Sequence, residues 1–257
     1  MVSSFREEST GVVPGDTETE ACSERVLLLS CMSLQMPDKR ALVAGGTGRV
    51  GREIAARLEA DGWSVVAAGR SDGDLRGRAG AQSLVADAVA RLGGLDLLVH
   101  AAGAGFAPRS IDEVTEDDWD AALDVTAKGT FFLAQAAAPA LRAARGTIVI
   151  LEDVASFQAW SSFAPHCAAK AAQAMLTRVL AQALAPEVRV CGVAPGPVAV
   201  DAGTEERRAA ETLLGRVGSP ADVAGAVLYL ASAPYVTGTT LVVDGGQLLK
   251  SGDHRGT

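Results

Sequence analysis

Histidine and cysteine are scarce in this sequence, which limits the metal and disulfide chemistry open to it. There are three histidines and four cysteines. The cysteines form no CxxC pair, and none lies beside a histidine cluster with the spacing of metal ligands: Cys22, Cys31, Cys167 and Cys191. A zinc site or disulfide framework is therefore excluded as the basis of the fold, and we expect free thiols and no metal.

Positive charge and long apolar runs are also lacking. The formal net charge is -8 at pH 7, whereas a protein that follows nucleic-acid phosphates needs a basic surface. The apolar run Val26–Leu34 is too short to span a bilayer, and the acidic residues before it do not fit a signal peptide. We therefore expect a cytoplasmic protein with no nucleic-acid or membrane partner. One phosphorylated small molecule in a local basic pocket remains compatible with this charge.

The chain has 257 residues, of which 48% are hydrophobic, enough for one large domain or two small ones. Residues 1–37 are rich in Ser, Thr and Glu and show no helical or strand period. We interpret them as a disordered leader, or as sequence upstream of a start at Met36. We expect one domain over residues 38–250 and a short tail at 251–257.

Short apolar runs alternate with helical stretches throughout the predicted domain. The predicted strands are 41–44, 64–68, 95–100, 147–151, 188–193 and 241–243. The predicted helices are 50–61, 80–92, 116–142, 162–184 and 220–232. Thr115 and the three acidic residues after it are typical of a helix start. This alternation predicts an α/β fold, a single doubly wound Rossmann domain with a mostly parallel sheet.

A glycine-rich loop follows the first predicted strand. Residues 46–51 fit G-x-G-x-x-G between a strand and a helix, the context in which this motif binds a dinucleotide. The glycines allow a tight turn and a close approach to a pyrophosphate, and the helix start supplies free N–H groups. The alternative is a structural glycine turn without a ligand.

The end of the second strand indicates which dinucleotide is bound. An NAD site places an acidic residue roughly twenty residues after the loop. Here the chain has Arg70 and Ser71, which suit a 2′-phosphate, with Arg49 as a second cation. NADP(H) is therefore favoured, although Asp72 opposes phosphate binding and both arginines could be ordinary surface residues.

Several motifs in order resemble those of the short-chain dehydrogenase/reductase family over about residues 38–250. Residues 44–51 resemble its TGxxxGxG loop, 98–103 its NNAG strand end and 194–198 the PG loop that meets the nicotinamide. Residues 215–220, 236–238 and 243–246 resemble its C-terminal signature. Taken with the loop and strand-end residues above, the cofactor-binding set is Gly45, Thr47, Gly48, Arg49, Val50, Gly51, Arg70, Ser71, Ala102, Gly103, Lys170, Pro195, Gly196 and Val198.

Within the family the chain looks closest to bacterial pteridine-reductase-like members. Arg49 in the glycine loop, Asp153 at the usual Ser position and the stretch Phe131–Gly146 carry this likeness. Phe106 is either a side chain that stacks on a substrate ring or an ordinary core or loop residue. The segment 72–94 is shorter than in most members, so we expect one strand–helix unit to be shortened or missing, which would expose one side of the adenine pocket.

The catalytic set departs from the family pattern. The family's Asn, Ser and Tyr positions hold Thr126, Asp153 and His166, and only Lys170 is as expected. The resemblance implies that His166 takes the role of proton donor, Lys170 holds the nicotinamide ribose, and Asp153 tunes His166 or contacts substrate. His166 and Lys170 are four residues apart on a predicted helix and share a face. An imidazole can transfer a proton near neutral pH, but it is shorter than a phenol.

Three functions remain open at this point. The first is an NADP(H)-dependent oxidoreductase that reduces a C=O or C=N bond of a small molecule, such as a ketone or a pterin-like compound. The second is a non-redox lyase, isomerase or cyclase in the same pocket, and the third is a non-catalytic binding protein. The resemblance also implies a substrate flap at 200–214 and a homo-oligomer, dimer or tetramer, built through 116–142 and 162–184.

Overall fold

The computed structural model describes residues 39–105, 107–198 and 202–250. The predicted leader, the predicted tail and Phe106 lie outside the described residues, so the structure leaves those three predictions as they stand.

Six strands form one sheet in which every neighbouring pair is parallel. They are β1 (Lys39–Ala44), β2 (Trp63–Ala68), β3 (Leu97–His100), β4 (Thr147–Leu151), β5 (Arg189–Pro195) and β6 (Thr240–Val243). Their order is β2-β1-β3-β4-β5-β6, so the winding reverses between β1 and β3, as in a doubly wound fold. The predicted fold class and all six predicted strands are confirmed, and the sheet is entirely parallel rather than mostly so.

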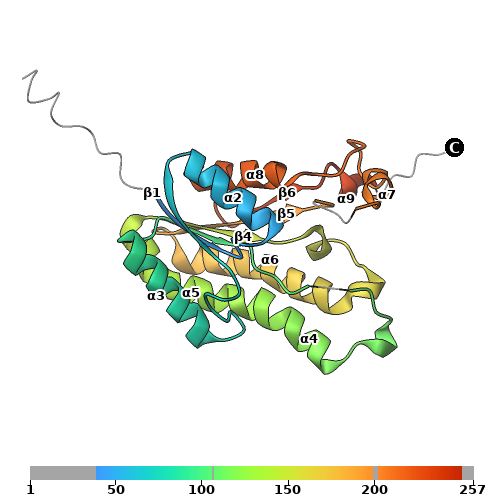
Figure 1. Ribbon diagram of the computed structural model, residues 1–257, viewed down its shortest axis with the longest axis horizontal. Helices are drawn as coiled ribbons and strands as arrows, with labels where there is room; N and C mark the ends of the chain where they lie inside the picture. Colours follow the sequence, from blue (N-terminus) through green and yellow to red (C-terminus); the bar gives the residue numbers. More distant parts are fainter. Residues whose placement is uncertain (1–38, 106, 199–201, 251–257) are drawn as a thin grey trace, which may run out of the picture. The chain divides into compact units, whose positions relative to one another are not determined.

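Helices cover both faces of this sheet (Figure 1). They are α2 (Arg49–Ala60), α3 (Arg78–Leu92), α4 (Glu116–Leu123), α5 (Gly129–Ala144), α6 (Ala164–Leu184), α7 (Glu205–Ala209), α8 (Pro220–Ser232) and α9 (Gln247–Lys250). The predicted helices 50–61, 80–92, 162–184 and 220–232 are confirmed as α2, α3, α6 and α8. Helices α7 and α9 are too short to leave a periodic pattern in the sequence.

Two apolar cores lie on the two faces because successive strand side chains point in opposite directions. On one face α2 and α8 cover the sheet, with Ile54 and Val227 fully buried. On the other face α3, α5 and α6 cover it, with Leu84, Leu133 and Leu180 buried. The fully apolar strands thus match a sheet that is covered on both sides.

The connection between β2 and β3 contains a single helix, α3, as the short segment 72–94 predicted. In the six-stranded order of the fully formed doubly wound fold, a further strand lies beyond the second one. Within the described residues β2 pairs with β1 alone and is the edge of the sheet. The missing unit therefore lies on the side of the sheet where an adenine would be expected.

The predicted helix 116–142 is correct at its start but is not continuous. Thr115 accepts a hydrogen bond from the backbone N–H of Asp118 and donates its own backbone N–H to the Asp118 carboxylate, which is a capping box. A π turn, Asp124–Lys128, separates α4 from α5. The Thr126 carbonyl in this turn accepts the hydroxyl of Thr130 at 2.6 Å, and such wide turns often occur at functional sites.

A test of the glycine loop compares two alanine variants at the start of α2. A Cβ at Gly51 would collide with the carbonyl oxygen of Gly45, which is backbone and cannot swing aside. We expect Gly51→Ala to destabilise the fold by about 1–3 kcal/mol, although alanine favours a helix over glycine by about 1 kcal/mol. Gly48→Ala is the matched control, because its Cβ would lie 3.4 Å from the same oxygen. Equal melting temperatures for the two variants in thermal unfolding would contradict this account.

Candidate active site

A cleft of about 1210 Å³ lies at the carboxyl ends of the strands. Its walls come from the residues that directly follow β3, β4 and β5, from the start of α6, and from α7 and α9. In an open parallel sheet this edge is where ligands bind, next to the point at which the strand order reverses. The volume is sufficient for a dinucleotide and a small substrate together.

The glycine loop forms one end of this cleft. A Cβ at Gly45 would lie 2.5 Å from the backbone of Ala101, and one at Gly46 would lie 2.8 Å from Ala67, so the loop packs directly against neighbouring strands. Helix α2 begins without a side-chain cap at Gly48, which leaves the helix start suited to an anion. Arg49 and Val50 line the cleft. These residues fit the pyrophosphate of a dinucleotide cofactor.

The other predicted cofactor residues fall into two groups. Ala102, Gly103, Pro195, Gly196 and Val198 line the cleft. Thr47, by contrast, packs against Gly69, while Arg70 and Ser71 are exposed in the turn after β2 and do not line the cleft. Asp72 accepts the backbone N–H of Gly69 at 2.7 Å, so its carboxylate is engaged in shaping that turn. The role of Arg70 and Ser71 stays a prediction.

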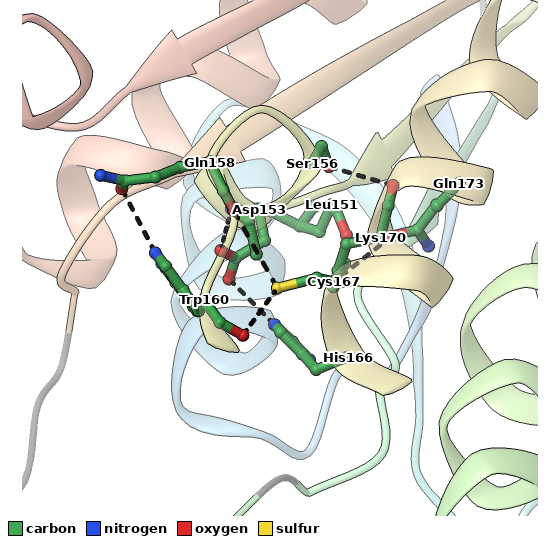
Figure 2. Close-up of polar contacts among 10 residues, drawn as sticks. Leu151, Asp153, Ser156, Gln158, Trp160, His166, Cys167, Lys170 and Gln173 are labelled. Atoms are coloured by element: carbon green, nitrogen blue, oxygen red, sulfur yellow. Dashed lines mark hydrogen bonds and ion pairs between the residues drawn. The ribbon is translucent and has the colours of Figure 1, made fainter. Parts of the chain in front are cut away.

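The predicted catalytic residues lie together on one wall of the cleft (Figure 2). His166 lies in the first turn of α6, and its Nε2 is 3.7 Å from Oδ2 of Asp153. The other Asp153 oxygen accepts the backbone N–H of Ala155 at 2.8 Å, which fixes the carboxylate. The imidazole is almost fully buried, with only 10% of the side chain exposed.

Trp160, which the sequence did not single out, stacks on His166. The two rings are nearly parallel, at 9°, with centroids 6.2 Å apart. The Sγ of Cys167 contacts the carbonyls of Gln158 and Trp160, and the indole N–H donates to the Gln158 side chain (Figure 2). The loop after β4 is thereby attached to α6, and it brings both an aromatic ring and a carboxylate next to the imidazole.

Lys170 lies one helical turn after His166 and is 8% exposed. Its Nζ donates to the carbonyl of Leu151 at 2.8 Å and to Oε1 of Gln173 at 2.9 Å. Burial lowers the pKa of Lys170 to about 8, although the carboxylates of Asp153 and Glu152 act in the opposite direction. An amine with this pKa is still mostly charged at neutral pH, but it changes its charge within the range in which enzymes work.

Glu152 is a second carboxyl group in the site that the sequence interpretation missed. It is 3% exposed and accepts hydroxyl hydrogen bonds from Thr177 at 2.6 Å and Thr240 at 2.9 Å. Burial raises the pKa of Glu152, although these two hydrogen bonds lower it in part. The signal that could have found Glu152 is that it and Asp153 are two adjacent acids at the end of a predicted strand.

The opposite wall is basic, although the protein as a whole is acidic. In the described part of the predicted flap, Arg207 and Arg208 contact Glu211 at 3.4 and 2.7 Å. Lys250 donates to the carbonyls of Ala210 and Thr212 at the end of α7. All four charged side chains line the cleft, so three cations face it with one anion from this wall.

The described residues contain no group of three or more His, Cys, Asp or Glu side chains arranged to hold a metal ion. Among the same residues, no helix has the length and apolar character needed to cross a bilayer.

Comparisons with known proteins agree with this architecture. A family model described as Enoyl-(Acyl carrier protein) reductase matches residues 71–247. The chain is 34% identical over 244 residues to human dehydrogenase/reductase SDR family member 4, covering 82% of this chain and 88% of that protein. It is 35% identical over 249 residues to 3beta-hydroxysteroid dehydrogenase 1 of Eggerthella lenta, covering 83% and 95%. The solved structure of carveol dehydrogenase from Mycobacterium avium in complex with NAD superposes with a TM-score of 0.76 at 24% identity, covering 84% and 99%, and shows the likeness in fold.

The buried lysine predicts how stability depends on pH. Between the folded pKa of about 8 and the ordinary value of 10.5, the unfolded chain binds a proton at Lys170 that the folded chain does not. Stability therefore rises with pH across this window, by at most about 1.4 kcal/mol per pH unit. We expect the free energy of unfolding of the wild type to rise between pH 8 and 10.5 relative to that of Lys170→Met. Parallel curves in denaturant titrations would show that Lys170 is not desolvated.

Proposed function

The chain belongs to the short-chain dehydrogenase/reductase family, and on that premise we propose that it is an NADP(H)-dependent oxidoreductase that reduces a C=O or C=N bond of a small molecule. The relatives named as dehydrogenases support oxidoreduction. The observation that carries the proposal is that His166, Asp153 and Lys170 line the same cleft as the glycine loop and the PG loop. A proton donor and a cofactor cradle then face one substrate.

In this proposal the residues at the carboxyl edge of the sheet would hold the cofactor. Gly45, Thr47, Gly48, Arg49, Val50 and Gly51, in the glycine loop and at the start of α2, would bind the pyrophosphate. Ala102 and Gly103 would support the sugar, and Pro195, Gly196 and Val198 would border the nicotinamide. When bound, the reduced cofactor supplies a hydride to the substrate carbon, and the protein's own task is to position the reactants and deliver a proton.

His166 delivers that proton. As the substrate carbon receives the hydride, the π electron pair of the C=O or C=N bond moves to the oxygen or nitrogen, which takes the proton from the His166 imidazole. The imidazole then takes up a proton from solvent. The Asp153 carboxylate, 3.7 Å from Nε2, balances part of the positive charge that the ammonium of Lys170 places beside the ring.

NADP(H) is preferred over NAD(H) because of Arg70 and Ser71. Their exposure after β2 leaves the guanidinium and hydroxyl accessible to a 2′-phosphate. NAD(H) is the alternative, and carveol dehydrogenase, which shares the fold, was solved in complex with NAD. The positive charge of Arg70 after β2 is the feature on which the choice between NADP(H) and NAD(H) depends.

The basic wall supports a substrate that carries an anionic group. Arg208 uses one N–H on Glu211, and a guanidinium has five donors in a fork that fits a carboxylate or a phosphate. The chain as a whole has a net negative charge, so this group of cations in the cleft is a local feature that would attract an anionic substrate.

A non-redox reaction in the same cleft is the second candidate, favoured by the carboxylate beside His166. An imidazole paired with a carboxylate can remove a proton from carbon, as lyases and isomerases require, without any hydride.

We also propose a homo-oligomer formed through α4, α5 and α6. Trp119, Phe131, Met175 and Val179 are large apolar side chains exposed on these helices. Clustered exposed apolar residues mark protein–protein contacts more often than isolated ones do. The proposals of a cytoplasmic location and of a pteridine-reductase-like subgroup rest on the sequence alone.

His166 tests the reaction. We expect His166→Phe to lower kcat at least about 100-fold in carbonyl or imine reduction, because the proton donor is removed, while NADPH affinity changes little. The measurement is loss of NADPH absorbance with keto acids, ketones and pterins, beside fluorescence titration with NADPH. Substrate turnover without NADPH oxidation would replace this function with the non-redox candidate. NADPH binding with no turnover of any substrate would favour a binding protein.

Arg70 tests the choice of cofactor. We expect Arg70→Ala to raise the Kd for NADPH roughly 10- to 100-fold, the value of a charge-assisted hydrogen bond, and to leave the Kd for NADH unchanged. Arg76→Ala is the matched control, because that exposed arginine in the same segment is paired with Asp74 at 2.8 Å. If both variants bind NADPH like the wild type, Arg70 is an ordinary surface residue.

A further inference from the structure

Behind Lys170, a group of polar side chains is buried between β3, the π turn, α5 and α6. His100, Thr126, Thr130, Lys170 and Gln173 are all at most 8% exposed. Polar side chains are rarely buried together unless their hydrogen bonds are satisfied. Gln173 lies at the centre of this group, is completely buried, and is not part of the proposed proton transfer.

The orientation of the Gln173 amide follows from the chemistry of its neighbours. An ammonium can only donate, so the atom 2.9 Å from Lys170 Nζ must be the amide oxygen, as the structure has it (Figure 2). The amide nitrogen therefore points the other way, toward Thr130 Oγ1 at 2.9 Å and the Thr126 carbonyl at 3.4 Å. An amide can accept from an ammonium at its oxygen and at the same time donate to a carbonyl or hydroxyl from its nitrogen.

His100 borders this arrangement on the side of β3. Burial, together with the charge of Lys170, lowers the pKa of His100 to about 3, so the imidazole is neutral. Its Nδ1 lies 3.2 Å from both Thr130 Oγ1 and Gln173 Nε2. The two N–H groups of the amide thus face polar atoms of β3, the π turn and α5.

Lys170 is in turn held by two acceptors that do not move. Nζ carries three N–H groups, and the Leu151 carbonyl and Gln173 Oε1 accept two of them. The third can be donated into the cleft, which Lys170 lines. Among the described residues, the Leu151 carbonyl at the end of β4 and the Gln173 amide oxygen therefore set the direction of this third N–H.

We propose that Gln173 is a positioning residue for Lys170: its amide, locked by the π turn and His100, keeps the ammonium charged and directs its remaining N–H toward the cofactor. The part that concerns the cofactor rests on the proposed function, whereas the part that concerns the charge of Lys170 does not. Gln173 lies three residues after Lys170 on the same face of α6, a spacing at which side chains meet.

Four other titratable groups lie around Lys170. Asp153 and Glu152, after β4, favour the charged amine through their carboxylates. His166 lies on the same helix, one turn before, and His100 on β3 is neutral. Substitution of Gln173 leaves all four groups in the protein, so a change in the Lys170 pKa on substitution reports the lost or altered contact with the amide oxygen.

The test measures the pKa of Lys170 directly. The chain has only four lysines, Lys39, Lys128, Lys170 and Lys250, so side-chain NMR of protein with isotope-labelled lysine gives few signals, and Lys170→Arg assigns the relevant one. Gln173→Met keeps the volume but removes the acceptor, and we expect the Lys170 pKa to fall by roughly one unit, a tenfold change in proton binding. Gln173→Glu places a carboxylate beside the ammonium and is expected to raise it.

The two variants and a cofactor titration separate the possible results. A Lys170 pKa in folded Gln173→Met equal to that of the wild type overturns the proposal, because a residue that only fills space would leave it unchanged. If Gln173→Met does not fold, a Lys170 pKa in Gln173→Glu that is not raised overturns it instead. With NADPH, we expect weaker binding to Gln173→Met and partial recovery in Gln173→Glu. If neither the wild type nor the variants bind NADPH, the proposed function fails, whereas the pKa result still decides the role of Gln173 in holding the charge.

Discussion

The close approach of the first loop to two strands is the constraint on which the rest of the structure depends. Gly45 has a φ of +87°, and a side chain at Gly45, Gly46 or Gly51 would occupy space already taken by the backbone or by Ala67. The loop can therefore lie directly on the carboxyl ends of β2 and β3, which brings the start of α2 down to the edge of the sheet. A bulkier loop would stand away from the sheet, and the first-turn amides of α2 would no longer face the cleft.

The same parallel arrangement assembles the wall that carries the proposed catalytic residues. Since all six strands run in one direction, the residues that follow β3, β4 and β5 meet at one edge although they are far apart in the sequence. Helix α6 then adds His166 and Lys170 from one face. Burial of a lysine at such a point lowers stability, and this structure offsets part of that cost with two carbonyl acceptors and two nearby carboxyl groups.

Fold and site differ in how far the sequence predicts them. The strands and long helices follow from periodicity and caps, because burial on one or both faces imposes a repeating pattern. The π turn does not follow from periodicity, because its backbone contacts include one from Gln173 on another helix to the Thr126 carbonyl, which the local sequence does not reveal. Similarly, Trp160 and Cys167 reach the site only because the loop after β4 folds back on α6. Motif matching found His166, Asp153 and Lys170 because they occupy family positions, whereas Gln173 and His100 have no such position to match.

The altered catalytic set becomes coherent when these additions are considered together. A histidine is shorter than a tyrosine, so proton transfer from it depends on holding the ring rigidly at the cleft wall. Trp160 and Asp153 both contact the ring, and the contact of Cys167 with the Trp160 carbonyl ties the loop of Trp160 to α6. Lys170 cannot turn toward His166 without losing its buried hydrogen bond to Gln173. The residues at the family's Tyr and Ser positions are therefore accompanied by further contacts around both His166 and Lys170, and a proposed proton donor shorter than a phenol depends on such contacts for its geometry.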